Sequence, residues 1–241
     1  MHPKLNGKKI VVIGGSSGIG LAAAKQLAQL GGQVTIVGRD ADKLRSAAGS
    51  AGVPMEHQTV NATSSADLAA FFQKLGSLDH LVLTLSGSKG SGPFADLSLD
   101  GLRDGFEAKF FAHVAAAQAA LPYLSKHGSI TFVSAISARG SMPGTAGLAA
   151  INGAIESMVK PLARELKPLR VNAISPGAIE TPWWDALPPE QRRSLLESVA
   201  SMSLVNRNGQ PDEVAQAIVF LVTNGFMTGT VIEIDGGLHL N

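Results

Sequence analysis

Short apolar runs recur along the chain, and their lengths predict buried β-strands. The first run covers residues 9–13, which is too short for a buried helix. Six later runs have a similar length and character, and helix-like segments separate most of them. These runs cover residues 33–37, 55–60, 80–85, 129–134, 169–174 and 230–234.

The alternation of strand and helix predicts the fold class. Short connections and the right-handed crossover rule favour a Rossmann-like α/β fold, with a doubly wound parallel sheet of seven strands and helices on both faces. In such a sheet the ligand crevice lies outside the carboxyl ends of the strands. No repeat or long linker interrupts the pattern, so we expect a single domain over residues 1–241.

A glycine-rich turn joins the first strand to helical sequence that continues to Leu30. Gly14 suits the tight turn, Gly18 lets the backbone approach a pyrophosphate, and Gly20 permits close packing of the helix. Free amides at a helix start attract phosphate, so this context predicts a dinucleotide site rather than a plain surface turn. We expect contacts from Gly14, Ser16, Ser17, Gly18, Ile19 and Gly20.

The composition of the chain argues against several classes of function. The 241 residues are 45% hydrophobic and 16% charged with a net charge of +1, which allows a large core and leaves no nucleic-acid footprint. No apolar stretch is long enough to span a membrane and residues 1–9 lack a signal-peptide core, so we expect a cytoplasmic protein. The chain has no cysteine, which excludes disulfides and thiol catalysis, and no histidine has metal-ligand spacing.

The chain resembles the single-domain short-chain dehydrogenases/reductases from about Gly7 to Gly237. Besides the glycine turn, the matching segments are residues 78–82, 170–177, 228–229 and 235–237. The resemblance implies an oxidoreductase with a nicotinamide cofactor. In that family a Pro-Gly turn and the residues just beyond it lie near the nicotinamide; these are Pro176, Gly177, Ile179 and Thr181 here.

The end of the second strand bears on the choice of cofactor. An acidic residue there accepts from the adenosine ribose hydroxyls, whereas an arginine accommodates a 2′-phosphate. Here Gly38 stands at the usual acidic position and Arg39 follows, so the site resembles NADP(H)-preferring members. The alternative is a solvated Arg39 beside Asp40, which caps the next helix. Asn61 falls near the adenine in the family, or is simply a turn asparagine.

Three positions at which the family carries catalytic groups hold other residues here. In the family a serine, a tyrosine and a lysine cooperate to move a proton to or from the substrate oxygen. Alignment from both flanks places Ala135, Leu148 and Asn152 at these positions. The only tyrosine, Tyr123, lies near the end of an earlier predicted helix and cannot substitute.

Lys109 falls where the family has an asparagine that supports a relay water. An ammonium in a cleft beside an oxidised nicotinamide has a lowered pKa, from desolvation and like-charge repulsion, and can then donate a proton. Alternatively, its side chain reaches solvent or satisfies a backbone carbonyl. Partial substitutes are Ser134, Ser137 and the amide of Asn152, which can still bind the ribose. Their alternative is packing at a strand end.

Two further segments complete the expected site. The family's motif after the fourth strand is altered over residues 83–87, so cofactor contact there rests on backbone, on Ser86 or Thr84, and on Gly87. Residues 181–206 stand in place of a substrate lid. The tryptophans Trp183 and Trp184 either form a wall over an apolar ligand, or pack against the body and an oligomer contact.

Two functions remain open. The first is an atypical NADP(H)-dependent oxidoreductase that acts on a carbonyl or hydroxyl of a small molecule, with the proton supplied by Lys109, a serine or water. The second is a catalytically silent NADP(H)-binding module, a sensor or structural oligomer. The resemblance also implies a homodimer or homotetramer built on the helical segments 102–124 and 148–166. We expect no nucleic-acid, membrane or metal partner.

Overall fold

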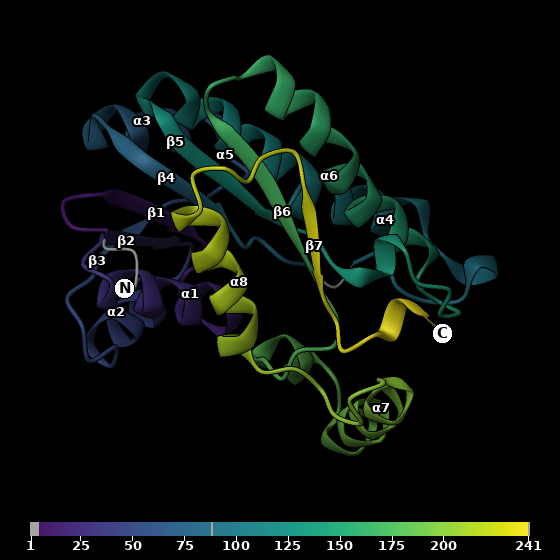
Figure 1. Ribbon diagram of the computed structural model, residues 1–241. Helices are drawn as coiled ribbons and strands as arrows, with labels where there is room; N and C mark the ends of the chain where they lie inside the picture. Colours follow the sequence, from purple (N-terminus) through teal and green to yellow (C-terminus); the bar gives the residue numbers. More distant parts are fainter. Residues whose placement is uncertain (1–4, 88, 241) are drawn as a thin grey trace.

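The computed structural model describes residues 5–87 and 89–240, so the first four residues of the polar N-terminal segment and Ser88 lie outside the described residues. Within these ranges seven strands form one parallel sheet in the order β3-β2-β1-β4-β5-β6-β7 (Figure 1). The predicted α/β fold class is confirmed. The strands are β1 (Lys9–Ile13), β2 (Gln33–Gly38), β3 (Glu56–Thr59), β4 (Leu78–Leu83), β5 (Leu124–Val133), β6 (Arg170–Pro176) and β7 (Val231–Ile234).

The strand order reverses at β1, which lies between β2 and β4. Such a reversal opens a crevice at the carboxyl ends of the strands, because the following connections leave in opposite directions. Parallel strands are covered on both faces, so consecutive positions in their sequences tend to be apolar. In β1, Ile10 to Ile13 are at most 1% exposed, as this rule requires.

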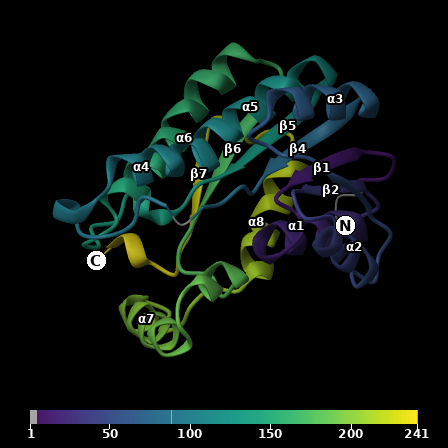
Figure 2. The same cartoon turned by 180° about the vertical axis from the view of Figure 1, so that it is seen from behind.

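Helices cover both faces of the sheet (Figures 1 and 2). One face carries α1 (Gly18–Gln29), α2 (Ala41–Gly49) and α8 (Pro211–Thr223), and the other carries α3 (Ser65–Leu75), α5 (Ala112–Ala120) and α6 (Ala146–Glu165). The short helix α4 (Leu99–Gly105) precedes α5, while α7 (Pro189–Met202) stands away from the sheet near the ends of the strands (Figure 1). Over the described ranges, no helix has the length and apolar character needed to cross a membrane.

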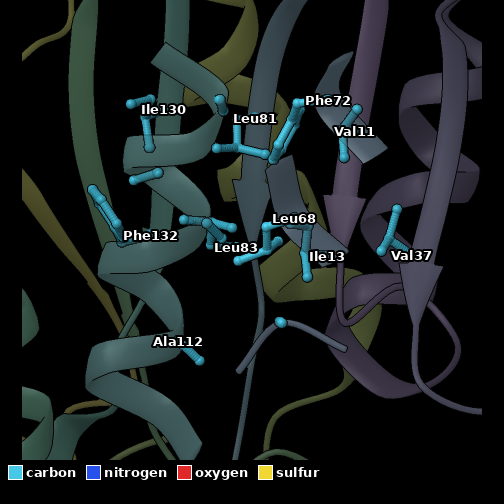
Figure 3. Close-up of a cluster of buried hydrophobic side chains, with 14 of the residues drawn as sticks. Val11, Ile13, Val37, Leu68, Phe72, Leu81, Leu83, Ala112, Ile130 and Phe132 are labelled. Atoms are coloured by element: carbon cyan, nitrogen blue, oxygen red, sulfur yellow. The ribbon is translucent and has the colours of Figure 1, made fainter. Parts of the chain in front are cut away.

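Each face of the sheet has its own apolar core. Figure 3 shows the core beneath α3 and α5, where Phe72 and Phe132 are fully buried and Leu68 packs near Ile13. Small side chains on α5 bring that helix close to the sheet; these are Ala112, Ala116, Ala117 and Ala120. The two cores hold the ends of β1, β4, β5 and β6 in fixed positions, which is where the predicted site residues cluster.

The predicted helical segment over residues 102–124 is helical as far as Tyr123, but it is not a uniform α-helix. α4 ends at Gly105, a π-helical turn occupies Phe106–Phe111, α5 ends at Ala120, and Leu121–Tyr123 is a short 3₁₀ turn before β5. Pro122 explains the last break, because it lacks the N–H that a continuing helix needs. A single π turn shifts the helical face without changing the apolar composition, so the sequence pattern hides it.

Candidate functional site

The glycine turn between β1 and α1 has the geometry of an anion cradle. Gly14 and Gly18 have positive φ angles of 91° and 50°. A Cβ on Gly20 would lie 2.3 Å from the carbonyl oxygen of Gly14, so only glycine lets α1 begin this close to the turn. Ser17 is the N-cap of α1 and its side chain makes no capping hydrogen bond. The first amides of the helix are therefore left for a ligand.

Thr84 holds this turn in place, a role different from the cofactor contact considered for it. Its hydroxyl donates to the Ile13 carbonyl at 3.0 Å. The same oxygen would lie 2.6 Å from a Cβ on Gly14 and 2.5 Å from one on Gly20. The strand end of β4 is thus packed directly against the turn. The predicted contacts Ser86 and Gly87 follow a few residues later, Ser86 exposed and Gly87 half-buried.

The structure brings the segment after β6 to the glycine turn. A Cβ on Gly18 would lie 3.2 Å from the methyl group of Thr181. Pro176 ends β6, and a Cβ on Gly177 would lie 2.8 Å from the Cα of Asp235. Ile179 is 5% exposed in the bridge that follows. The glycine turn and the segment after β6, distant in the sequence, therefore meet at the carboxyl ends of the strands.

At the end of β2, the predicted adenosine end of the crevice offers an unpaired cation. Arg39 is exposed and takes part in no ion pair within residues 5–87 and 89–240. Asp40 accepts hydrogen bonds from the amides of Asp42 and Lys43, so it caps α2 as expected. Asn61 accepts from the amide and hydroxyl of Thr63, which is the turn role considered for it.

Asn152 and Leu148 lie one turn apart on α6. The Asn152 amide donates to the Leu148 carbonyl at 2.9 Å and to the Ser137 hydroxyl at 3.0 Å. Its oxygen Oδ1 is buried and has no hydrogen-bond partner among the described residues. A buried acceptor without a partner is costly, and a ribose hydroxyl would satisfy it. The glycine cradle and this orphaned oxygen both fit a nicotinamide dinucleotide.

Lys109 lies in the π-helical turn, and its side chain is buried. Its ammonium donates to the carbonyl oxygen of Ser134 at 3.1 Å, at the end of β5. Desolvation lowers the pKa of Lys109 to about 8, and the charge of Glu156 opposes this shift. The alternative in which the side chain reaches solvent is wrong, whereas the contact with a backbone carbonyl is present.

The Ser134 hydroxyl is less available to a substrate than the sequence suggested. Its hydroxyl donates to Glu156 Oε1 at 2.7 Å and lies 3.2 Å from the Ile174 carbonyl. Glu156 Oε2 accepts from Arg139 Nε at 2.9 Å. Sequence reasoning missed Glu156, although its position four residues after Asn152 places both on one face of a helix. The Ser134 hydroxyl is therefore engaged by a buried carboxylate rather than free for a substrate.

The expected lid segment begins with two tryptophans in different surroundings. The Trp184 indole donates to the Ile179 carbonyl at 2.8 Å, which fixes that ring to the body. Trp183 is 37% exposed, and its ring lies nearly perpendicular to that of Trp184, with centroids 4.6 Å apart. α7 follows this pair. Trp183 is thus the ring with surface left for a ligand or another protein.

Comparisons with known proteins agree with this geometry. The family model described as Enoyl-(Acyl carrier protein) reductase matches residues 13–239. The chain is 30% identical to the short-chain dehydrogenase/reductase ATR9 of Stachybotrys chlorohalonatus, covering 99% of each protein, and 32% identical to the 3-oxoacyl-[acyl-carrier-protein] reductase FabG of Thermotoga maritima, covering 98% of this chain and 99% of that protein.

A solved structure supports the same assignment. It is that of a small-chain dehydrogenase in complex with NADPH, with a TM-score of 0.85 and 32% identity over 97% of this chain and 99% of that chain. Both the sequence matches and the structural match run across nearly the whole length. The chain therefore belongs to the short-chain dehydrogenase/reductase family of oxidoreductases.

Proposed function

We propose that the protein is an NADP(H)-dependent oxidoreductase that acts on a carbonyl or hydroxyl group of a small molecule, with Lys109 as its proton donor. The observation that carries the proposal is the buried ammonium of Lys109 at the end of β5. It lies beside Ala135, the position that the family resemblance assigns to a serine. Desolvation lowers the pKa of Lys109 to about 8, close to the operating range of a general acid.

Cofactor choice follows from the end of β2. NADP(H), when bound, supplies or accepts the hydride at the substrate carbon. Gly38 carries no carboxylate to repel a 2′-phosphate, and Arg39 has a guanidinium without an ion-pair partner in the described part of the chain. Guanidinium and phosphate form strong paired hydrogen bonds. The NADPH complex of the 32%-identical relative supports the same choice.

The chain's own groups account for the proton. As a substrate carbonyl becomes an alcohol, its oxygen gains negative charge, which the Lys109 ammonium stabilises before donating a proton to it. Lys109 becomes a neutral amine and regains a proton from water. Within the described residues its ammonium donates to the Ser134 carbonyl, and a substrate oxygen would accept from another of its N–H groups. Asn152 holds the ribose through its orphaned oxygen.

Replacing Arg39 by alanine tests the cofactor choice. NADPH should bind about 10–100-fold more weakly, because a charge-assisted hydrogen bond contributes about 1.5–3 kcal/mol. Affinity for NADH, which lacks the 2′-phosphate, should not change. Titration calorimetry measures both dissociation constants. Arg45→Ala is the matched control, since Arg45 is exposed on α2 and paired with Asp42. Equal losses for NADPH and NADH in Arg39→Ala would argue against NADP(H) preference.

The proposed activity is tested by single-turnover oxidation of protein-bound NADPH, followed by absorbance while a broad panel of carbonyl compounds is added. Binding is confirmed first, so that a missing cofactor is not mistaken for a missing reaction. Decay of NADPH with some members of the panel supports the proposal. Saturable binding without decay across the panel contradicts it.

One observation favours the alternative, a catalytically silent NADP(H)-binding module. The only tyrosine, Tyr123, stacks on Phe72 in the core, with ring centroids 6.4 Å apart, so it cannot serve as a proton donor in the crevice. Leu148, at the position that the resemblance assigns to the tyrosine, offers only an aliphatic side chain. A module of this kind binds NADPH tightly and never oxidises it.

A further inference from the structure

Glu156 is a largely buried carboxylate to which the family resemblance gives no role. Its side chain is 9% exposed on α6, one helical turn beyond Asn152. A carboxylate so far from water is costly unless hydrogen bonds and opposite charges compensate it. The partners of its two oxygens therefore indicate what it does.

Each carboxylate oxygen of Glu156 has its own partner. Oε1 accepts from the Ser134 hydroxyl at 2.7 Å, and Oε2 accepts from Arg139 Nε at 2.9 Å. Arg139 is also bound by the carboxylate of Glu233 on β7. The carboxylate is held from both sides, and it in turn fixes Ser134 at the end of β5.

Ser134 connects Glu156 to Lys109. Its hydroxyl is bound to Glu156, while its backbone carbonyl accepts from the Lys109 ammonium at 3.1 Å. Ser134 thus links the largely buried carboxylate to the buried ammonium, through its hydroxyl on one side and its backbone carbonyl on the other. The Glu156 charge also raises the pKa of Lys109, against the larger lowering by desolvation.

Few other charges act on Lys109. His113 on α5 donates to the Lys109 carbonyl, and because burial lowers its pKa to about 4, its ring is neutral near pH 7. Behind Glu156 lie Arg139 and then Glu233. The remaining charged groups on the helical elements around Lys109 are Asp100, Arg103, Asp104, Glu107, Lys160, Arg164 and Glu165. Glu156 is the one whose charge raises the Lys109 pKa.

We infer that Glu156 is a positioning residue for the proposed reaction: through Ser134 and through its negative charge, it keeps Lys109 at the end of β5 as an ammonium that can give up its proton. The inference rests on the proposed function only for the use of that proton. The arrangement itself, a carboxylate that sets the charge and place of a buried lysine, is a property of this chain's own residues.

The test follows the Lys109 amine directly by NMR in the full-length protein labelled with ¹³C and ¹⁵N in its lysine side chains. Loss of a signal in Lys109→Met assigns the resonance. In the wild type the amine should titrate with a midpoint of about 8. In Glu156→Gln the midpoint should fall by about one pH unit, because an attractive charge has been removed. The amide keeps the size of the side chain and an acceptor oxygen for Ser134.

Two further variants sharpen the result. Arg139→Met removes the cation that offsets Glu156, so the Lys109 midpoint should move upward, opposite to Glu156→Gln; Arg139 is 39% exposed, which favours folding of this variant. Glu165→Gln removes an exposed carboxylate on the same helix and should leave the midpoint unchanged. Circular dichroism confirms that each variant is folded.

The outcomes separate this inference from the proposed function. If oxidoreductase activity is present, the alkaline limb of the NADPH-oxidation rate should move to lower pH in Glu156→Gln, with the Lys109 midpoint. If the Lys109 midpoint shifts in Glu156→Gln but the protein never oxidises NADPH, Glu156 is still a positioning residue for Lys109. The proposed function is then wrong. An unchanged Lys109 midpoint in folded Glu156→Gln and Arg139→Met overturns the inference, whatever the turnover.

Discussion

Lys109→Met should oxidise bound NADPH about 10²–10⁴ times more slowly than the wild type in the presence of a carbonyl substrate, because a general acid typically contributes that factor. Methionine keeps the length of the side chain and fills the buried site without the ammonium. NADPH affinity should stay within a few-fold of wild type. Stopped-flow absorbance measures the rate, and calorimetry measures the affinity.

The pKa of Lys109 also predicts the direction in which the reaction rate changes with pH. Desolvation lowers the pKa of Lys109 to about 8, so the proton that it donates is present below that pH and lost above it. The wild-type rate should therefore fall as the pH rises through about 8, and this limb should be missing in Lys109→Met. Lys160→Met, which changes an exposed lysine on α6, should keep both rate and limb. If Lys109→Met oxidised NADPH as fast as the wild type, Lys109 would not be the proton donor.

Gly20→Ala should weaken NADPH binding by at least about 100-fold. The added Cβ would lie 2.3 Å from the Gly14 carbonyl oxygen and 2.5 Å from Thr84 Oγ1, and the first of these is backbone that cannot rotate away. Either the glycine turn opens or α1 moves off β4, and relieving such overpacking costs about 3 kcal/mol or more. Both movements displace the amides that the phosphates need. Fluorescence titration with NADPH measures the loss.

Gly49→Ala is the control for that substitution. Gly49 is also helical, at the end of α2, and its added Cβ would have no neighbour within 4 Å. NADPH affinity should be unchanged, and the free energy of unfolding should rise by about 0.4–1 kcal/mol as the unfolded chain loses freedom. If Gly20→Ala bound NADPH like Gly49→Ala, the glycine turn would not be the phosphate site.

The central strands could be predicted because they are predominantly apolar runs between helices, whereas β3 is polar and exposed along its whole length. A parallel strand in the middle of the sheet is buried on both faces, and this requirement appears directly in the sequence of β1. The segment around Lys109 could not be predicted, since a π turn changes which side chains face inward without changing the composition. For the same reason, the predicted helical segment over residues 102–124 did not reveal the change of helix type within it.

The candidate site was predictable where a backbone requirement selects the residue. Gly14 and Gly18 have positive φ, and Gly20 has no room for a Cβ, so the glycine turn shows in the sequence. Glu156 was missed because its role depends on Ser134 and Arg139, which reach it from outside its own helix. A lone glutamate in a helix is usually a solvated one, and only the fold shows that it is buried.

The central claim is hydride transfer by this protein, and the most direct measurement uses NADPH that carries deuterium at the transferable position of the nicotinamide ring. The protein is loaded with this cofactor and mixed with a carbonyl substrate found in the single-turnover panel, and the product is analysed by mass spectrometry. The account predicts one deuterium on the former carbonyl carbon, formed in the wild type and strongly reduced in Lys109→Met. NADPH that stays bound and deuterated, with no labelled alcohol from any carbonyl compound, would contradict it.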